Sequence, residues 1–202
     1  AEALKRVGEG AWRGTRFWRE QIRELRYAAM LHDFGKVGVR EEVLVKAKKL
    51  PPYLFERVES PFHLIPRTAE ADYYRRRADI MRAGGAEMLR ELEESFEREL
   101  GELKQFQQAV RTANEPSVLP QESAAILGEI ALRRFRTPDG DEAPFISGEE
   151  LHFLTIPKGS LDEHERLEIE SHVEQTYRFL TQIPWTDDLR NLADIAYGHH
   201  EK

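Results

Sequence analysis

A long charged stretch with a regular apolar pattern limits the folds that this chain can adopt. From about residue 53 to residue 111 the chain is dense in arginine and glutamate, and apolar residues recur at spacings near three and four. That period places them on one face of an α-helix. Gly84 and Gly85 interrupt the stretch, which predicts long amphipathic helices broken or kinked there, as in a hairpin. The apolar positions are Tyr73, Tyr74, Ile80, Met81, Met88, Leu92, Phe96, Leu100, Leu103, Phe106 and Val110.

The rest of the chain also shows the helical period. Residues 1–7 predict the end of a helix, followed by a connection rich in glycine, and residues 16–34 predict the next helix. Further helices are expected at about 121–135, from Ser160 to about 180, and from about 187 onward. Ser160 has Glu163 three residues later, which is the spacing of a capping box. Residues 137–141 predict a turn, and no segment predicts a strand, so the expected fold class is all-α.

Composition and charge narrow the possible functions. The net charge of −7 argues against general nucleic-acid binding, which needs a basic face, but allows a small anionic ligand held by local cations. Cysteine is absent, so His, Asp or Glu would have to hold any metal. No apolar run reaches the length of a membrane span and no signal-peptide core is present. We therefore expect no membrane contact and a cytoplasmic location. Because the sequence does not begin with Met, we expect it to be part of a longer protein.

One short block combines residue types that metal and phosphate chemistry require. His32 and Asp33 are adjacent at the end of an apolar helical run, so an imidazole nitrogen and a carboxylate oxygen can reach one ion. Such ligands suit first-row metals such as Fe, Mn, Co, Ni or Zn. Gly35 would let the backbone turn sharply at the helix end, and Lys36 places a cation where a phosphate would be neutralised. Taken alone, the block fits a solvent-facing helix end better, so partners elsewhere must decide.

The remaining histidines differ in what their surroundings predict. His199 and His200 follow the apolar positions of the last helix, and two adjacent imidazoles would be costly to bury there without a partner. Their side chains diverge, so a metal cluster would explain them. His172 lies on a helix with an apolar face, and either a core-edge position or metal ligation fits it. The others are predicted to be surface residues: His63 in a proline-flanked loop, His152 and His164.

Three ordered blocks resemble the HD-GYP family of the HD superfamily of metal-dependent phosphohydrolases. The first is His-Asp-Phe-Gly-Lys-Val-Gly-Val at residues 32–39. The second runs from Pro157 to Glu165 and is followed by His172; it is similar to the family's lysine-glycine-leucine-glutamate helix start and the histidine after it. The third, Ile195 to Glu201, looks like the family's double-histidine helix end.

The resemblance implies a fold, a metal centre and an activity. It implies an HD-domain-like helical bundle in which His32, Asp33, His172, His199 and His200 hold two or three divalent metal ions, Fe or Mn being typical and other first-row metals possible. Asp33 would bridge two metals, and Lys36 would contact a substrate phosphate. The implied activity is hydrolysis of a cyclic dinucleotide, such as cyclic di-GMP, by in-line attack of a metal-bound hydroxide. Uncompensated positive charge around such a centre would favour bridging phosphate or hydroxide.

The sequence also departs from the family pattern. The glycine-tyrosine-proline segment that names the family should follow Glu201, and a later aspartate ligand would lie beyond Lys202. Many HD enzymes also use a histidine on the helix before the His-Asp block. No histidine precedes His32 here, so we expect that ligand, and a sensory domain, upstream. About a hundred residues separate the first two blocks. The chain is thus predicted to be one HD-GYP-like domain over residues 1–202, interrupted by a helical insertion at about 52–150.

Three functions remain open at this level. The first is a cyclic dinucleotide phosphodiesterase, and the second is a degenerate module that senses the nucleotide or binds a protein without hydrolysis. The third is an HD phosphohydrolase that acts on a mononucleotide or a modified nucleotide. The narrow apolar stripe from Leu92 to Val110 fits an ordinary solvated helix or a coiled-coil-like seam, which would make the insertion a homodimer contact.

Overall fold

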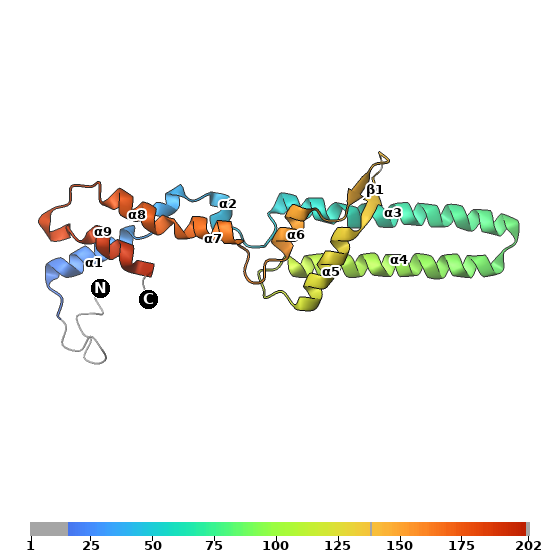
Figure 1. Ribbon diagram of the computed structural model, residues 1–202, viewed down its shortest axis with the longest axis horizontal. Helices are drawn as coiled ribbons and strands as arrows, with labels where there is room; N and C mark the ends of the chain where they lie inside the picture. The colour runs from blue at the N-terminus through green and yellow to red at the C-terminus, as the bar shows by residue number, and fades with distance from the viewer. Residues whose placement is uncertain (1–15, 138, 201–202) are drawn as a thin grey trace. The chain divides into compact units, whose positions relative to one another are not determined.

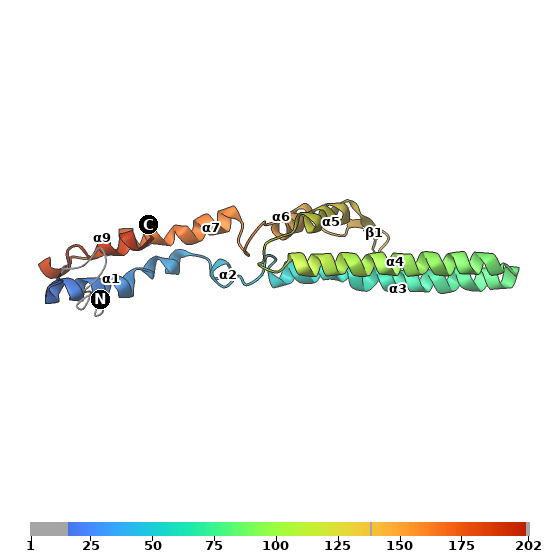
Figure 2. The ribbon, with the colours of Figure 1, turned by 90° about the horizontal axis from the view of Figure 1, so that it is seen from below.

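The computed structural model describes residues 16–137 and 139–200, and the chain divides into two compact units (Figures 1 and 2). The first unit combines residues 1–45 with 163–202, and the second comprises residues 46–162. Both are built mainly from helices, which confirms the all-α prediction. The helix end predicted over residues 1–7 and the glycine-rich connection after it lie outside the described residues.

Two long antiparallel helices form the frame of the second unit (Figure 1). Helix α3 spans Pro52–Ala83 and helix α4 spans Ala86–Ala113. The break predicted at Gly84 and Gly85 is confirmed. Gly84 has a left-handed φ of 77°, a conformation that glycine adopts without a Cβ penalty. The N–H groups of Gly84 and Gly85 donate to carbonyls of the last turn of α3, which ends the helix.

Helix α3 continues through two prolines. Pro61 and Pro66 lie inside it, so His63 is on a helix and not in the predicted proline-flanked loop. An interior proline costs roughly 3 kcal/mol because it removes a hydrogen bond and crowds the preceding turn. Leu54, Val58 and Phe62 are buried in the core of this unit, and their packing outweighs that local cost.

A second layer covers part of the α3–α4 hairpin (Figure 2). It consists of helix α5 (Gln121–Leu132), strands β1 (Arg134–Arg136) and β2 (Glu142–Pro144), and helix α6 (Gly148–Leu154). The strands pair antiparallel with Phe135 opposite Ala143. The expectation of helix to about residue 135 and of no strand was therefore wrong. Residues 137–141 do lie between the paired strands, where a turn was predicted. The buried core comprises Leu50, Leu54, Val58, Phe62, Leu103, Phe106, Val110, Ala113, Leu127, Ile130, Phe145, Ile146 and Leu154.

The first unit is assembled from two separate chain segments. The earlier segment forms α1 (Arg19–Leu31), the 3-10 turn η2 (Phe34–Gly38) and α2 (Glu41–Leu44). The later segment forms α7 (Glu163–Glu170), α8 (His172–Leu180), η3 (Asp187–Leu189), α9 (Leu192–Tyr197) and η4 (Gly198–His200). Helix α8 packs against both η2 and α9, and α1 packs against α9. The buried core is Ala28, Leu180, Leu192, Ala193 and Ala196.

The predicted start of the seventh helix needs correction. Helix α7 begins at Glu163, and Ser160 is not its N-cap. Ser160 lies three residues before the first residue of α7, and its hydroxyl donates to the carbonyl of Lys46. The capping-box spacing is used elsewhere, because Ser147 and Glu150 exchange side-chain and backbone hydrogen bonds at the start of α6. Among the described helices, none is long and apolar enough to cross a membrane.

Candidate metal centre

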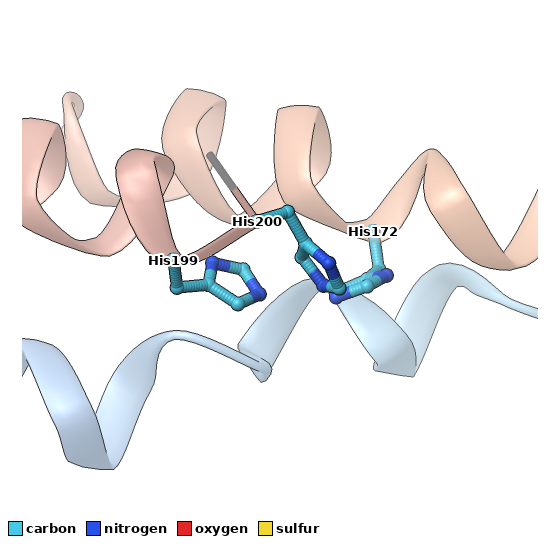
Figure 3. A group of neighbouring side chains, drawn as sticks. All are labelled: His172, His199 and His200. Carbon is cyan, nitrogen blue, oxygen red and sulfur yellow. The ribbon is translucent and has the colours of Figure 1, made fainter. Parts of the chain in front are cut away.

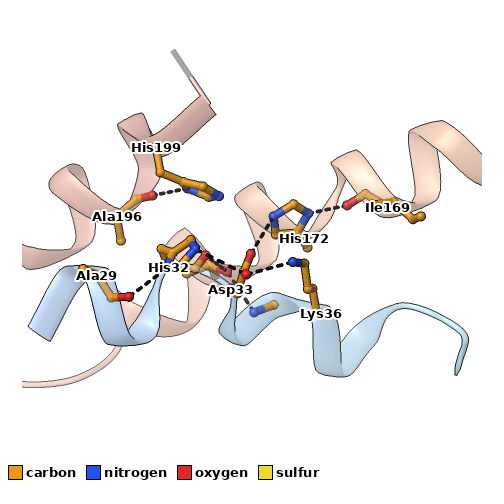
Figure 4. Close-up of polar contacts among 10 residues, drawn as sticks. Ala29, His32, Asp33, Lys36, Ile169, His172, Ala196 and His199 are labelled. Carbon is orange, nitrogen blue, oxygen red and sulfur yellow. Dashed lines mark hydrogen bonds and ion pairs between the residues drawn. The ribbon is translucent and has the colours of Figure 1, made fainter. Parts of the chain in front are cut away.

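Three helix ends in the first unit bring the candidate ligands together (Figure 4). His32 is the C-cap residue of α1, and Asp33 follows it immediately. His172 opens α8, while His199 and His200 form the last turn, η4. All five predicted ligands therefore lie in one region of one unit, although they come from segments far apart in the sequence.

Asp33 occupies the middle of this group. Its Oδ2 atom is 3.3 Å from Nε2 of His32, and its Oδ1 atom is 3.3 Å from Nε2 of His172. The two oxygens of one carboxylate thus face two different imidazoles. The Lys36 ammonium donates to Oδ2 at 2.8 Å. That hydrogen bond is the main reason why the pKa of Asp33 lies below its ordinary value, and the neighbouring histidines act in the same direction. Asp33 is therefore a carboxylate at neutral pH.

Three imidazoles are oriented by backbone carbonyls that lie three residues earlier in the chain. Nδ1 of His32 is 2.9 Å from the carbonyl oxygen of Ala29, and Nδ1 of His199 is 2.5 Å from that of Ala196. Nδ1 of His172 likewise contacts the carbonyl oxygen of Ile169. A carbonyl only accepts, so each Nδ1 must carry the proton and donate it. Each Nε2 of a neutral ring then keeps a lone pair, the state that a metal ligand needs.

Two of these nitrogens are buried without a hydrogen-bond partner. In the described part of the chain, Nε2 of His172 and Nε2 of His199 are the buried side-chain nitrogen or oxygen atoms that lack one. The contact of His172 with Asp33 is an ion-pair distance of 3.3 Å and does not meet hydrogen-bond geometry. Leaving such an atom unsatisfied typically costs about 1–3 kcal/mol. A bound cation would remove that cost, so the donor set fits a metal.

Two overlapping groups have the spacing of a cation site. His172, His199 and His200 form one group (Figure 3), and His32, Asp33 and His199 form the other. Within each group the candidate ligand atoms lie within 4.8 Å of one another. The rings of His199 and His200 have centroids 4.2 Å apart, so these neighbours stay close although they extend from adjacent positions. This His/Asp cluster could hold a metal ion.

Gly35 allows the two halves of the cluster to approach. A Cβ atom at this position would lie 2.1 Å from the carbonyl oxygen of His172 and 2.7 Å from the backbone nitrogen of Thr176. Gly35 has no positive φ, in contrast to Gly84. The sequence correctly singled out this glycine, but the reason is different: it provides space for η2 against α8, and its backbone is not unusual.

Neither ligand group contains any of the three other histidines. His63 lies in α3, 3.6 Å from Glu59, and His152 lies in α6, 3.2 Å from Asp162. Both belong to the second unit, and His164 is in the first turn of α7. Sequence reasoning did not identify Thr176 or the three carbonyls that orient the imidazoles. The spacing of three residues from each carbonyl to its histidine at a helix end was the available signal.

A small cavity adjoins the cluster. It has a volume of about 280 Å³ and lies between α1 and α9, with His32 and His199 on its wall. The rest of its lining is aliphatic: Leu25, Ala28, Ala29, Ile195 and Ala196. The candidate centre therefore has a polar side with Asp33 and Lys36 and an apolar side.

Comparison with known proteins does not identify this chain. No protein-family model matches it, and neither a curated protein nor a solved structure does.

Proposed function

We propose that this protein is a metal-dependent phosphodiesterase that hydrolyses a cyclic dinucleotide, cyclic di-GMP or a relative. The observation that carries the proposal is the pair of buried, unpartnered Nε2 atoms of His172 and His199 beside the Asp33 carboxylate. The reaction and substrate class come from the resemblance of the three sequence blocks to the HD-GYP family. The geometry supports the metal-binding part of that resemblance, because all five implied ligands converge.

The residues suggest how the ions would be divided. His199 belongs to both candidate groups, but with Nδ1 bonded to Ala196 it offers only one nitrogen, Nε2. Asp33 offers two oxygens that face different imidazoles, so it is the side chain best suited to bridge two ions. We propose two or three divalent metals, Fe or Mn. Such ions would polarise a phosphoryl oxygen and lower the pKa of water.

The other polar group of the site is Lys36. Its ammonium lies 2.8 Å from Asp33 and keeps that carboxylate ionised, which metal ligation requires. The same ammonium is half-exposed, so it can also contact a phosphate oxygen of a substrate. Asp33 is the single carboxylate of the two candidate groups, so several imidazoles and one carboxylate leave excess positive charge around divalent ions. An anionic phosphodiester would balance that charge.

The proposal is tested by metal content and turnover. The protein is purified anaerobically, its bound Fe and Mn are quantified, and hydrolysis of cyclic di-GMP is measured for wild type and Asp33→Ala. We expect the variant to lose more than about a hundredfold in turnover and to bind less metal, because it loses the bridging ligand. Asp79→Ala is the matched control, since Asp79 is an exposed carboxylate paired with Arg82 on α3.

The possible outcomes separate the proposed functions. Intact turnover in Asp33→Ala would contradict the mechanism. Metal binding and nucleotide binding without turnover would favour the degenerate sensor module. Turnover of a mononucleotide but of no cyclic dinucleotide would favour a different HD phosphohydrolase.

A further inference from the structure

A single buried hydroxyl spans the turn that carries His32 and Asp33. Thr176 is fully buried on α8, one helical turn after His172. Its Oγ1 accepts a hydrogen bond from the backbone N–H of Gly35 at 2.8 Å and donates one to the carbonyl oxygen of His32 at 3.1 Å. A threonine hydroxyl has one donor and can accept as well, so both roles are filled at once.

These two bonds enclose the candidate bridging ligand. The carbonyl of His32 precedes Asp33, and the N–H of Gly35 follows Asp33 by two residues. A carbonyl at the C-terminal end of α1 and an N–H in the first turn of η2 have no partner within their own helices and need one from outside. Thr176 supplies it from the helix that also carries His172. The hydroxyl thus fixes the His32–Asp33 turn relative to the imidazole of His172.

We propose that Thr176 is a positioning residue of the metal centre. This inference rests on the proposed function, because it concerns the same site. The two oxygens of Asp33 each lie 3.3 Å from an imidazole nitrogen, one on α1 and one on α8. A shift of the turn against α8 would change both distances together. Groups that orient metal ligands from outside the coordination sphere typically change metal affinity by about 10–100-fold.

Three substitutions separate the hydroxyl from the volume of the side chain. Thr176→Val keeps the shape and removes both hydrogen bonds, leaving the His32 carbonyl and the Gly35 N–H without this partner. Thr176→Ser keeps the hydroxyl and removes only the methyl group. Thr176→Ala removes both the hydroxyl and the methyl group and creates a small cavity. It replaces Thr176→Val in the test if the valine variant does not fold.

The experiment is Co²⁺ binding by the complete chain, followed through its visible absorption spectrum. We expect Thr176→Val and Thr176→Ala to bind Co²⁺ about tenfold or more weakly, with an altered spectrum, and Thr176→Ser to resemble wild type. Two controls accompany them. Thr181→Val removes a hydroxyl that donates to the Arg178 carbonyl on the same helix, and Leu180→Val weakens the core beside the site. Neither should change the spectrum.

The outcomes distinguish this inference from the proposal on which it rests. Absence of Co²⁺ binding by wild type overturns the metal centre and the inference with it. Binding by wild type with unchanged affinity and spectrum in Thr176→Val overturns the inference alone. If Thr176→Ser loses as much Co²⁺ affinity as Thr176→Val, the inference is also overturned, because loss of the hydroxyl would then not explain the weaker binding. Loss in Leu180→Val equal to that in Thr176→Val would show a general structural effect and overturn it too.

Discussion

Gly35 is the residue at which the smallest change should do the most damage. An added Cβ would meet two backbone atoms of α8, which can move only if the helices separate. We expect Gly35→Ala to lower the free energy of unfolding by about 2–4 kcal/mol and to abolish high-affinity metal binding. Urea denaturation and Co²⁺ binding check this.

Gly38→Ala is the matched control for that change. Its Cβ would meet the end of the Gln175 side chain, which can rotate away. We therefore expect Gly38→Ala to lower the free energy of unfolding, and Co²⁺ binding, much less than Gly35→Ala does. Equal losses in the two variants would show that close approach to α8 is not what Gly35 provides.

Lys49 is a cation enclosed by the core of the second unit. It is 0 % exposed, and its ammonium donates to the carbonyl of Leu154 at 3.3 Å. Burial lowers the pKa of Lys49 below its ordinary value of 10.5. The unfolded chain therefore holds this proton more tightly, so stability from this group rises with pH between the folded pKa and 10.5.

Replacing Lys49 by methionine should remove that cost. We expect Lys49→Met to raise the free energy of unfolding by about 1–2 kcal/mol at pH 7, with a smaller gain near pH 10. Urea denaturation at both pH values measures it. Lys104→Met, at an exposed position of α4, is the control with little expected effect. A destabilised Lys49→Met protein would show that the contact with Leu154 outweighs desolvation.

At the scale of elements, Glu59 and Arg111 join α3 to α4. Burial alone would raise the pKa of Glu59, but hydrogen bonds from Arg111 and Gln107 outweigh it and leave the pKa below the ordinary 4.5. Because the folded pKa is lowered, this group stabilises the protein above pH 4.5. That contribution is lost as the pH falls through the folded pKa.

Removing the arginine should expose this pH dependence. We expect Arg111→Ala to cost about 2–3 kcal/mol at pH 7, since it leaves Glu59 buried without its charged partner, and less in acid, where Glu59 becomes protonated. Thermal unfolding followed at pH 7 and pH 3.5 tests this. Arg90→Ala, which breaks an exposed pair with Glu94, should change stability little at either pH.

The outer part of the α3–α4 hairpin is thinly covered. From residue 63 to residue 102 no residue is buried, and Tyr74, Met81 and Met88 are each more than half exposed. Tyr73 stacks on Phe96 within the hairpin, with ring centroids 4.5 Å apart. A second hairpin packed on this one would form a four-helix bundle and bury these exposed side chains. Within the stripe from Leu92 to Val110, Leu103, Phe106 and Val110 are already buried in the core of this unit.

We therefore expect the full chain to form a homodimer through this hairpin. Sedimentation equilibrium should give a dimer for wild type and a monomer for the double variant Met81→Glu, Met88→Glu. Val118→Glu, at an exposed loop position, should leave the dimer intact. A wild-type monomer at high concentration would contradict the prediction.

Sequence periodicity located most elements but not their ends. Apolar spacing and the two glycines predicted the α3–α4 hairpin, because both signals act within one helix. The periodicity missed the β1–β2 pair, whose strands have only three residues each. The Ser160 cap was wrong because α7 begins only at Glu163, and capping-box spacing does not fix where a helix starts. The candidate ligands were named from distinctive residue types together with the resemblance of three blocks, and the structure brings them into one region. Thr176 could not, because its role depends on a contact between segments 141 residues apart.

At the scale of the whole molecule, the two units offer separate spectroscopic signals. Trp18 and Trp185, the tryptophans among the described residues, belong to the first unit, while the two longest helices belong to the second. Tryptophan fluorescence therefore follows the unit with the candidate metal centre. Far-UV circular dichroism comes mostly from the second unit, which holds α3, α4, α5 and α6.

Metal binding should raise the unfolding temperature of the first unit, which fluorescence reports, and not that of the second unit, which dichroism reports. At a free Mn²⁺ concentration of 100 times Kd, binding adds about 2.7 kcal/mol to the stability of the unit that holds the ion. We expect the fluorescence transition to move to higher temperature while the main dichroism transition stays in place, and EDTA to reverse the shift. Equal movement of both transitions would contradict a centre confined to the first unit.

The contact between α2 and α7 has a consequence for how much this chain can vary. Arg40 binds Glu168 through several hydrogen bonds of 2.7–3.0 Å, so the point where the chain leaves the first unit lies beside the point where it returns. The polypeptide can make a long detour between Asp33 and His172 without drawing them apart. A detour of almost any length or sequence, including a linker of a few residues in place of 46–162, would therefore leave the imidazoles and their carboxylate where they are.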